Sequence, residues 1–345
     1  MKSKSKNHFI LFLVILFAVL FVAVFVLKPE QIQEIRNFFN EQEIQTVQNE
    51  DESYKAPQND ILKTSDDLQS VKDDPAAENA QTSWKETENS PLYFGNPSGA
   101  TFEVQNKTNY LIVKKGYTLS YNSEKLIPNW VCWHLDSSDI GESGRADNFR
   151  PDETLPENWY AVKKADYQYK KYGFDRGHVC PSADRTSDAE KNSETFYMTN
   201  MIPQAPDLNR IVWKDLEAFE RNQTTEGKEV YVAAGPYGTG GKSGTGEWNS
   251  ILIFKKSGEL EMSVPSFCWK ILLILDEGEL DYSRINEETE IISVFIPNEQ
   301  GVQNSGGWQN YVCSVDFIEE KTGFDFFAEL PDSVENLLEA KVYGN

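Results

Sequence analysis

The sequence predicts one mixed α+β domain with a central sheet, preceded by a membrane-spanning helix and a disordered stalk. Three observations lead to this fold class. Residues 1–28 contain 19 consecutive apolar residues. Residues 29–92 carry 15 acidic residues against five basic ones, with few aromatic residues. Residues 93–345 alternate strand-like apolar runs with helical patterns, and this segment is long enough for one sizeable core.

The N-terminal segment predicts an uncleaved membrane anchor. Its apolar run from Phe9 to Leu27 can span a bilayer. The lysines at positions 2, 4 and 6 favour a cytoplasmic N-terminus and an exported remainder. A cleaved signal peptide, which would make the protein secreted, is the alternative. The run ends in Phe25-Val26-Leu27-Lys28-Pro29, without the small residues of a cleavage site, so we favour the anchor.

The acidic segment that follows is expected to stay disordered. It has too little apolar surface to offset the entropy lost when a chain becomes ordered. One interpretation is a tether that holds the domain away from the membrane, and the other is filler without a selected length. The sequence leaves both interpretations open.

Short apolar runs bounded by turn residues predict the strands of the domain. An early group comprises Tyr110–Lys114, Tyr117–Ser120 and Asn129–Leu135, and Phe196–Met201 follows. The central sheet is expected to contain Val230–Ala234, Ser250–Lys255, Lys270–Leu275 and Ile291–Ile296.

Capping residues and helical spacing predict the helices. Ser187-Asp188-Ala189-Glu190 has the form of a capping box. A longer amphipathic helix is expected from Asn209 onward, and two more at Ser314–Lys321 and Ser333–Lys341. Residues 235–246 hold six glycines without the spacing of a phosphate-binding P-loop, so we expect a mobile surface loop there.

The most informative motif is Asp175-Arg176-Gly177-His178, because Asn209 and Glu217 follow it on the expected amphipathic helix. A histidine can accept a proton from water, and an arginine can stabilise charge on phosphate oxygens. An amide and a carboxylate can hold a hard cation. These are the groups needed to hydrolyse a phosphodiester.

Helix geometry separates the roles of Asn209 and Glu217. Eight residues of α-helix place Glu217 within roughly 80° of Asn209 but about 12 Å further along the axis. We therefore expect Asn209 to bind the ion directly and Glu217 to reach it through water. One neutral ligand with several waters suits Mg²⁺, with Mn²⁺ as the alternative.

The run FYMTNMIPQAPDLNRIVWKDLE, together with the Asp175–His178 motif, resembles the DNA/RNA non-specific endonuclease family, the Serratia-type and endonuclease G-like nucleases. The resemblance covers about residues 93–340. It implies a central antiparallel sheet and a ββα-metal motif at the active site. It also implies that His178 is the general base, that Asn209 binds Mg²⁺, that Glu217 completes the site and that Arg176 contacts phosphate. The implied substrates are DNA and RNA, and the implied products carry 5′-phosphates.

Other residues near the motif receive weaker assignments. Arg145 and Arg150 compete for the role of a second arginine that binds phosphate. We interpret His134 as a packed, hydrogen-bonded strand residue and Asn200 as a strand-end or supporting residue rather than a metal ligand. Asp175 is expected to orient the turn.

The net charge of −22 opposes binding of a polyanion. Residues 145–185, however, carry eight basic residues against seven acidic ones, so the predicted site is the least acidic part of the domain. Local potential rather than net charge governs binding in a cleft. We therefore expect weak, non-specific binding that depends strongly on salt and divalent ions.

Two other functions stay open at this point. The domain could be a non-catalytic surface module that binds nucleic acid or another anionic partner, or a hydrolase of a different phosphodiester. The sequence does not determine the oligomeric state. The four cysteines (Cys132, Cys180, Cys268 and Cys313) are compatible with structural thiols or with disulfides in an exported domain. We reject a Cys180–His178 nucleophile pair, because adjacency in sequence does not create the required geometry.

Overall fold

The computed structural model describes residues 88–344. The predicted anchor, residues 1–28, and residues 29–87 of the predicted stalk lie outside the described residues. Within residues 88–344, no helix is both long enough and apolar enough to cross a membrane. Leu92, the last residue assigned to the stalk, is buried in the domain, and the boundary at residue 93 stays a prediction.

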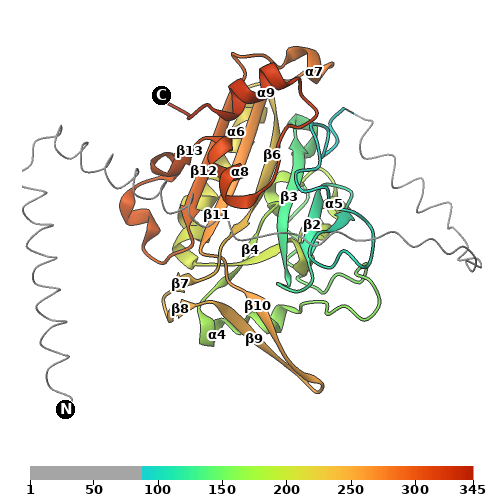
Figure 1. The fold of residues 1–345 in the computed structure, drawn as a ribbon, viewed down its shortest axis with the longest axis vertical. Coiled ribbons are helices and arrows are strands. Elements are labelled where there is room, and N and C mark those ends of the chain that lie inside the picture. The colour runs from blue at the N-terminus through green and yellow to red at the C-terminus, as the bar shows by residue number, and fades with distance from the viewer. Residues whose placement is uncertain (1–87, 345) are drawn as a thin grey trace, which may run out of the picture. The chain divides into compact units, whose positions relative to one another are not determined.

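Seven strands of the described chain form one antiparallel sheet in the order β1-β2-β3-β6-β11-β12-β13 (Figure 1). Their bounds are β1(Tyr110–Val113), β2(Thr118–Asn122), β3(Ile127–Leu135), β6(Lys228–Tyr237), β11(Phe267–Asp276), β12(Glu290–Pro297) and β13(Val312–Cys313). Every neighbouring pair is antiparallel. The predicted mixed α+β domain with a central antiparallel sheet is therefore confirmed.

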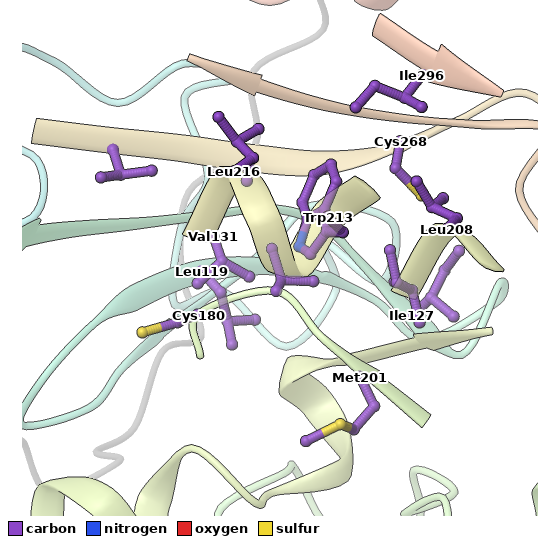
Figure 2. Packing of buried hydrophobic residues seen from close by; sticks show 14 of the residues in the cluster. Leu119, Ile127, Val131, Cys180, Met201, Leu208, Trp213, Leu216, Cys268 and Ile296 are labelled. Atoms are coloured by element: carbon purple, nitrogen blue, oxygen red, sulfur yellow. The ribbon is translucent and has the colours of Figure 1, made fainter. Parts of the chain in front are cut away.

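Side chains that alternate along the strands separate two hydrophobic cores, one on each face of the sheet. In β3, Trp133 belongs to the first core and Cys132 to the second. The first core contains α6(Trp213–Thr225), and Figure 2 shows Trp213 of this helix close to Cys268 of the sheet. The second core contains residues of α8(Val315–Thr322) and α9(Asp332–Glu339). The short helices are α4(Tyr169–Tyr172), α5(Ala189–Glu194) and α7(Asp281–Arg284).

Three two-stranded sheets lie outside the main sheet. They are β4(Asp175–His178) with β5(Met201–Gln204), β7(Gly241–Ser243) with β8(Gly246–Trp248), and β9(Ser250–Lys255) with β10(Gly258–Ser263). The prediction that Ser250–Lys255 belongs to the central sheet is wrong, because this strand pairs only with β10, the next strand along the chain. The apolar alternation marked a strand without revealing its partner.

The prediction of a mobile loop at residues 235–246 is also wrong. Strand β6 continues to Tyr237, and the glycine-rich remainder forms the β7–β8 hairpin. Ser243 is buried, and its Oγ donates a hydrogen bond to the carbonyl of Tyr172. The glycines here allow close packing: a Cβ on Gly241 would lie 2.8 Å from the carbonyl oxygen of Pro265.

Two predicted boundaries near the motif need correction. The run Phe196–Met201 is mostly the 3₁₀ turn η4(Met198–Asn200), and only Met201 enters strand β5. Helix α5 is capped by Asp188 rather than Ser187, because the Asp188 carboxylate accepts hydrogen bonds from the backbone N–H groups of Glu190 and Lys191.

Candidate active site

Strands β4 and β5 and helix α6 bring the motif residues together. Strand β4 pairs antiparallel with β5, so that Arg176 lies opposite Pro203 and His178 opposite Met201. The chain then leads through the π-helical turn η5(Leu208–Val212) directly into α6. The order of elements is therefore strand, strand, helix. The expected α-helix from Asn209 begins instead as a π turn, a variation that is frequent at functional sites.

His178 lies at the end of β4 in an aromatic box. Its ring packs edge to face against Phe196, with 4.7 Å between ring centroids, and lies 5.5 Å from Phe149. The side chain is buried, and its Nε2 has no hydrogen-bond partner among the described residues. Burial, reinforced by the positive charges of Arg145 and Arg176, lowers the pKa of His178 to about 3. The imidazole is therefore neutral at physiological pH.

The two aromatic rings that pack against His178 also contact Arg176 and Arg145. The guanidinium carbon of Arg176 lies 4.7 Å from the Phe149 ring, and that of Arg145 lies 4.8 Å from the Phe196 ring. Cation–π contacts of this kind hold a guanidinium in place without using its hydrogen-bond donors. Nε of Arg176 is buried without a partner, whereas Arg145 donates one hydrogen bond to Oγ of Ser182 at 2.9 Å.

Arg150 has a different environment from Arg145. It donates to the carbonyl of Ser193 at 2.7 Å, and its guanidinium stacks on the Tyr197 ring at 3.9 Å. Its backbone also bridges to Tyr197. Of the two candidates, the structure places the charge of Arg145 beside His178 and uses Arg150 to hold the segment that leads into η4.

Asn209 lies in the π turn next to the start of β4. Its side-chain Nδ2 donates to Oδ2 of Asp175 at 2.9 Å. Arg210 engages the same carboxylate at both oxygens, at 2.7 Å each. Asp175 is thus fully occupied in fixing the π turn against the strand, which agrees with its expected orienting role. The oxygen of the Asn209 amide is the atom left to accept a ligand.

Glu217 lies eight residues after Asn209, in helix α6, and its side chain is half-buried. Burial raises the pKa of Glu217 to about 7, and the charge of Asp184 adds to the rise, whereas Lys270, Arg221 and Arg145 oppose it. Because Arg145 influences both His178 and Glu217, the two predicted residues border the same charged region.

Residues 97–333 match the DNA/RNA non-specific endonuclease family. A nuclease from Nostoc is 43% identical to the chain over 251 residues, which is 73% of the chain and 85% of the relative. The mitochondrial nuclease EXOG from Homo sapiens is 27% identical, over 62% of the chain and 56% of its own length. A chain in the crystal structure of the EndoG/EndoGI complex has a TM-score of 0.55 at 24% identity, covering 71% of this chain and 92% of that one.

This chain belongs to the DNA/RNA non-specific endonuclease family. It is a nuclease, and the resemblance found from the Asp175–His178 motif is confirmed. The endonuclease G likeness supports the same mixed fold with a central antiparallel sheet.

A buried charge network lies beneath the nuclease site, and the sequence did not reveal it. Nζ of Lys270, on β11, contacts Oε2 of Glu220 at 2.7 Å, and both side chains are fully buried. Arg221 contacts Oδ1 of Asp184 at 2.9 Å. The network anchors the face of α6 that carries Glu217. A lysine within an apolar strand was the available signal, but no local pattern indicated its partner.

Asn200 and the cysteines support the nuclease site structurally. The Asn200 amide accepts from the backbone N–H of Cys180 at 3.0 Å and donates to the Cys180 carbonyl at 2.8 Å, which fixes the chain just after His178. All four cysteines are free thiols, so no disulfide forms within the described residues. Burial raises the pKa of the Cys180 thiol, which disfavours the thiolate that a nucleophile needs.

A second group of possible ligands, His134, Asp136 and Asp139, has potential ligand atoms within 4.8 Å of one another. Its charges are already satisfied, because Arg185 lies 2.9 Å from the Asp139 carboxylate and His134 Nε2 lies 3.0 Å from Glu229. We therefore do not assign a metal here. The interpretation of His134 as a packed, hydrogen-bonded strand residue is confirmed.

Proposed function

We propose that this nuclease is a metal-dependent endonuclease that hydrolyses phosphodiester bonds in both DNA and RNA and leaves 5′-phosphates. The observation that carries the proposal is a neutral histidine held between two arginines. His178 is uncharged at physiological pH, and Arg145 and Arg176 each stack on a ring that also packs against it. This arrangement combines a base with two cations that can bind a phosphate.

His178 acts as the general base in the proposed reaction. A neutral imidazole accepts a proton from the attacking water. Nε2 is closed off from solvent, so Nδ1 is the ring nitrogen that can meet the water. The packing of Phe149 and Phe196 around the ring holds its orientation. The base therefore needs no rearrangement before the proton moves.

Arg176 and Arg145 bind the phosphate oxygens and stabilise the charge that develops on them. Stacking on the aromatic rings leaves most of their N–H groups available for this purpose. Lys164 adds a further positive charge, with its Nζ 5.2 Å from the Phe149 ring. This local concentration of cations opposes the negative net charge of the chain.

The residues around the π turn fit a hard divalent cation. Asn209 gives an amide hydrogen to Asp175, which leaves its Oδ1 as an oxygen ligand. Glu217 would contact the ion through water, and burial, the largest cause, raises its pKa despite the positive charges of Lys270, Arg221 and Arg145. Mg²⁺ suits one neutral ligand with several waters, and Mn²⁺ is the alternative. A bound ion would neutralise charge on the phosphate oxygens.

The test uses the full chain, purified and incubated with plasmid DNA and with RNA, in Mg²⁺ and in EDTA. We expect Mg²⁺-dependent cutting of both polymers, with His178→Ala losing a factor of about 10²–10⁴ in rate. Thermal unfolding of His178→Ala checks that it still folds. Equal cutting by wild type and His178→Ala would overturn the assignment of the base. A folded wild type that cuts neither polymer would point to a different phosphodiester. Anchoring through Phe9–Leu27 stays a prediction from the sequence.

A further inference from the structure

Helices α8 and α9 carry a group of acidic residues far from His178 in the sequence. Oxygen atoms of Asp316, Glu319 and Glu339 lie within 4.8 Å of one another. Both helices pack on the second core, through Val315 and Leu338 among others, and Figure 1 shows them in red beside the sheet. The acidic group therefore lies between two elements that the fold holds together.

No basic side chain neutralises this group. Within residues 88–344, none of the three carboxylates takes part in an ion pair with a lysine or an arginine. The two lysines nearest in the sequence have other partners: Lys321 pairs with Glu320 at 3.0 Å, and Lys341 donates to backbone carbonyls. The excess negative charge at this position is thus uncompensated by the protein.

Glu339 distinguishes this group from a cluster of exposed acidic residues, because its side chain is buried. Its side chain is only 6% exposed, and its Oε1 is closed off from solvent without a hydrogen-bond partner. The backbone N–H of Phe326 donates to Oε1 of Glu319 at 2.7 Å, which leaves Oε1 of Glu339 without a donor beside the other carboxylates. Only a shared proton or a cation can satisfy it.

We propose that Asp316, Glu319 and Glu339 form a binding site for a divalent cation, of which Ca²⁺ is the best match, and that the cation ties α9 to α8. Ca²⁺ accepts six to eight oxygen ligands at about 2.4 Å in flexible geometry, so two of its ligands can lie up to about 4.8 Å apart. Mg²⁺ requires shorter distances and stricter geometry. Asp316 is exposed, which lets water complete the coordination.

The site is separate from the proposed catalytic metal. The match to the endonuclease family ends at residue 333, whereas Glu339 lies beyond it. One of the three carboxylates therefore lies outside the matched segment, and the inference does not depend on the proposed function.

The test measures thermal unfolding of the full chain at pH 7.5 with added CaCl₂ or MgCl₂. The three proteins are wild type, Glu339→Gln and Asn209→Ala, the last with the proposed catalytic ligand removed. We expect Ca²⁺ at about 100 times its Kd to raise Tm by roughly 5–10 °C in wild type and in Asn209→Ala. Glu339→Gln, which mimics the protonated side chain, should lose this rise.

Two results would overturn the site. One is no effect of Ca²⁺ on wild type, which would mean that a shared proton alone satisfies Glu339. The other is an effect that persists in Glu339→Gln but disappears in Asn209→Ala, which would place the ion at the catalytic ligands. If Glu339→Gln does not fold, Asp316→Asn replaces it, because Asp316 is exposed and its change to Asn leaves the packing intact. Asp316→Asn should then reduce the Ca²⁺-dependent rise, and an unchanged rise would also overturn the site.

Discussion

Gly177, inside the motif, offers a sharp test of how the site is built. A Cβ at this position would lie 1.8 Å from Oε1 of Gln204 and 2.7 Å from its Cγ. Gln204 is on the paired strand β5 and is fully buried, so it has no open space to move into. Gly177→Ala therefore forces β4 and β5 apart.

The expected effects on stability and on activity differ in size. Overpacking of a buried position costs about 1–3 kcal/mol of unfolding free energy. Gly177 lies between Arg176 and His178, so any shift of β4 moves both groups. A displacement of about 1 Å at a catalytic group can reduce the rate by roughly 10²-fold. We therefore expect the rate of cleavage to fall by more than the loss of unfolding free energy alone would cause.

Truncation of Gln204 supplies the rescue. Its Oε1 is buried without a partner and its Nε2 makes only a long contact, 3.7 Å, with Sγ of Cys268. Gln204→Ala therefore removes the clash without breaking a strong hydrogen bond. The double variant Gly177→Ala/Gln204→Ala should recover about 0.5–3 kcal/mol relative to the sum of the single changes, together with part of the activity.

The assays are urea unfolding and steady-state cleavage of plasmid DNA in Mg²⁺. Gly278→Ala is the matched control, because its Cβ would meet only Arg284, at the ordinary contact distance of 3.6 Å, on an exposed loop. Activity of Gly177→Ala equal to that of Gly278→Ala would contradict the predicted separation of β4 and β5. A double variant without any recovery would contradict the predicted clash with Gln204.

Four further predictions follow from the site and its surroundings. The low pKa of His178 keeps the imidazole neutral, so an NMR titration should show no protonation of the His178 ring between pH 5 and 8; protonation near pH 6.5 would contradict the burial argument. Arg145→Ala should lower kcat/KM on DNA by at least about tenfold and reduce the salt dependence of kcat/KM. Arg150→Ala should mainly lower Tm. The reverse pattern would exchange the roles of the two arginines. Lys270→Met should lower the free energy of unfolding, measured in urea, by about 3 kcal/mol or more, because it leaves Glu220 buried without its partner. The double variant Lys270→Met/Glu220→Gln should recover part of this loss. Thiol titration of the urea-unfolded protein without reductant should count four free cysteines, and a count of two or none would contradict the thiol state.

The sequence alone determined the family and most of the regular structure. The Asp175–His178 motif and the downstream residues Asn209 and Glu217 are enough to indicate the nuclease family. The strands of the central sheet could be predicted because apolar alternation is a local signal, repeated every two residues.

The tertiary structure decided the environment of each site residue. Two aromatic residues surround His178: Phe149, from a loop, and Phe196, which lies 47 residues further along the chain. No local sequence pattern indicates that these two residues are in contact. Helical periodicity could not indicate the π turn that holds Asn209 against Asp175, because the turn departs from the 3.6-residue repeat.

The same limit applies to partners and to charge states. The distinction between Arg145 and Arg150 and the lack of disulfides depend on which segments pack together. Propensity and spacing indicate which secondary structure a segment forms and which of its side chains share a face. Burial, pKa and pairing are set by neighbours that are distant in sequence, as in the contact between Lys270 and Glu220 across the first core, and only the folded chain brings those neighbours together.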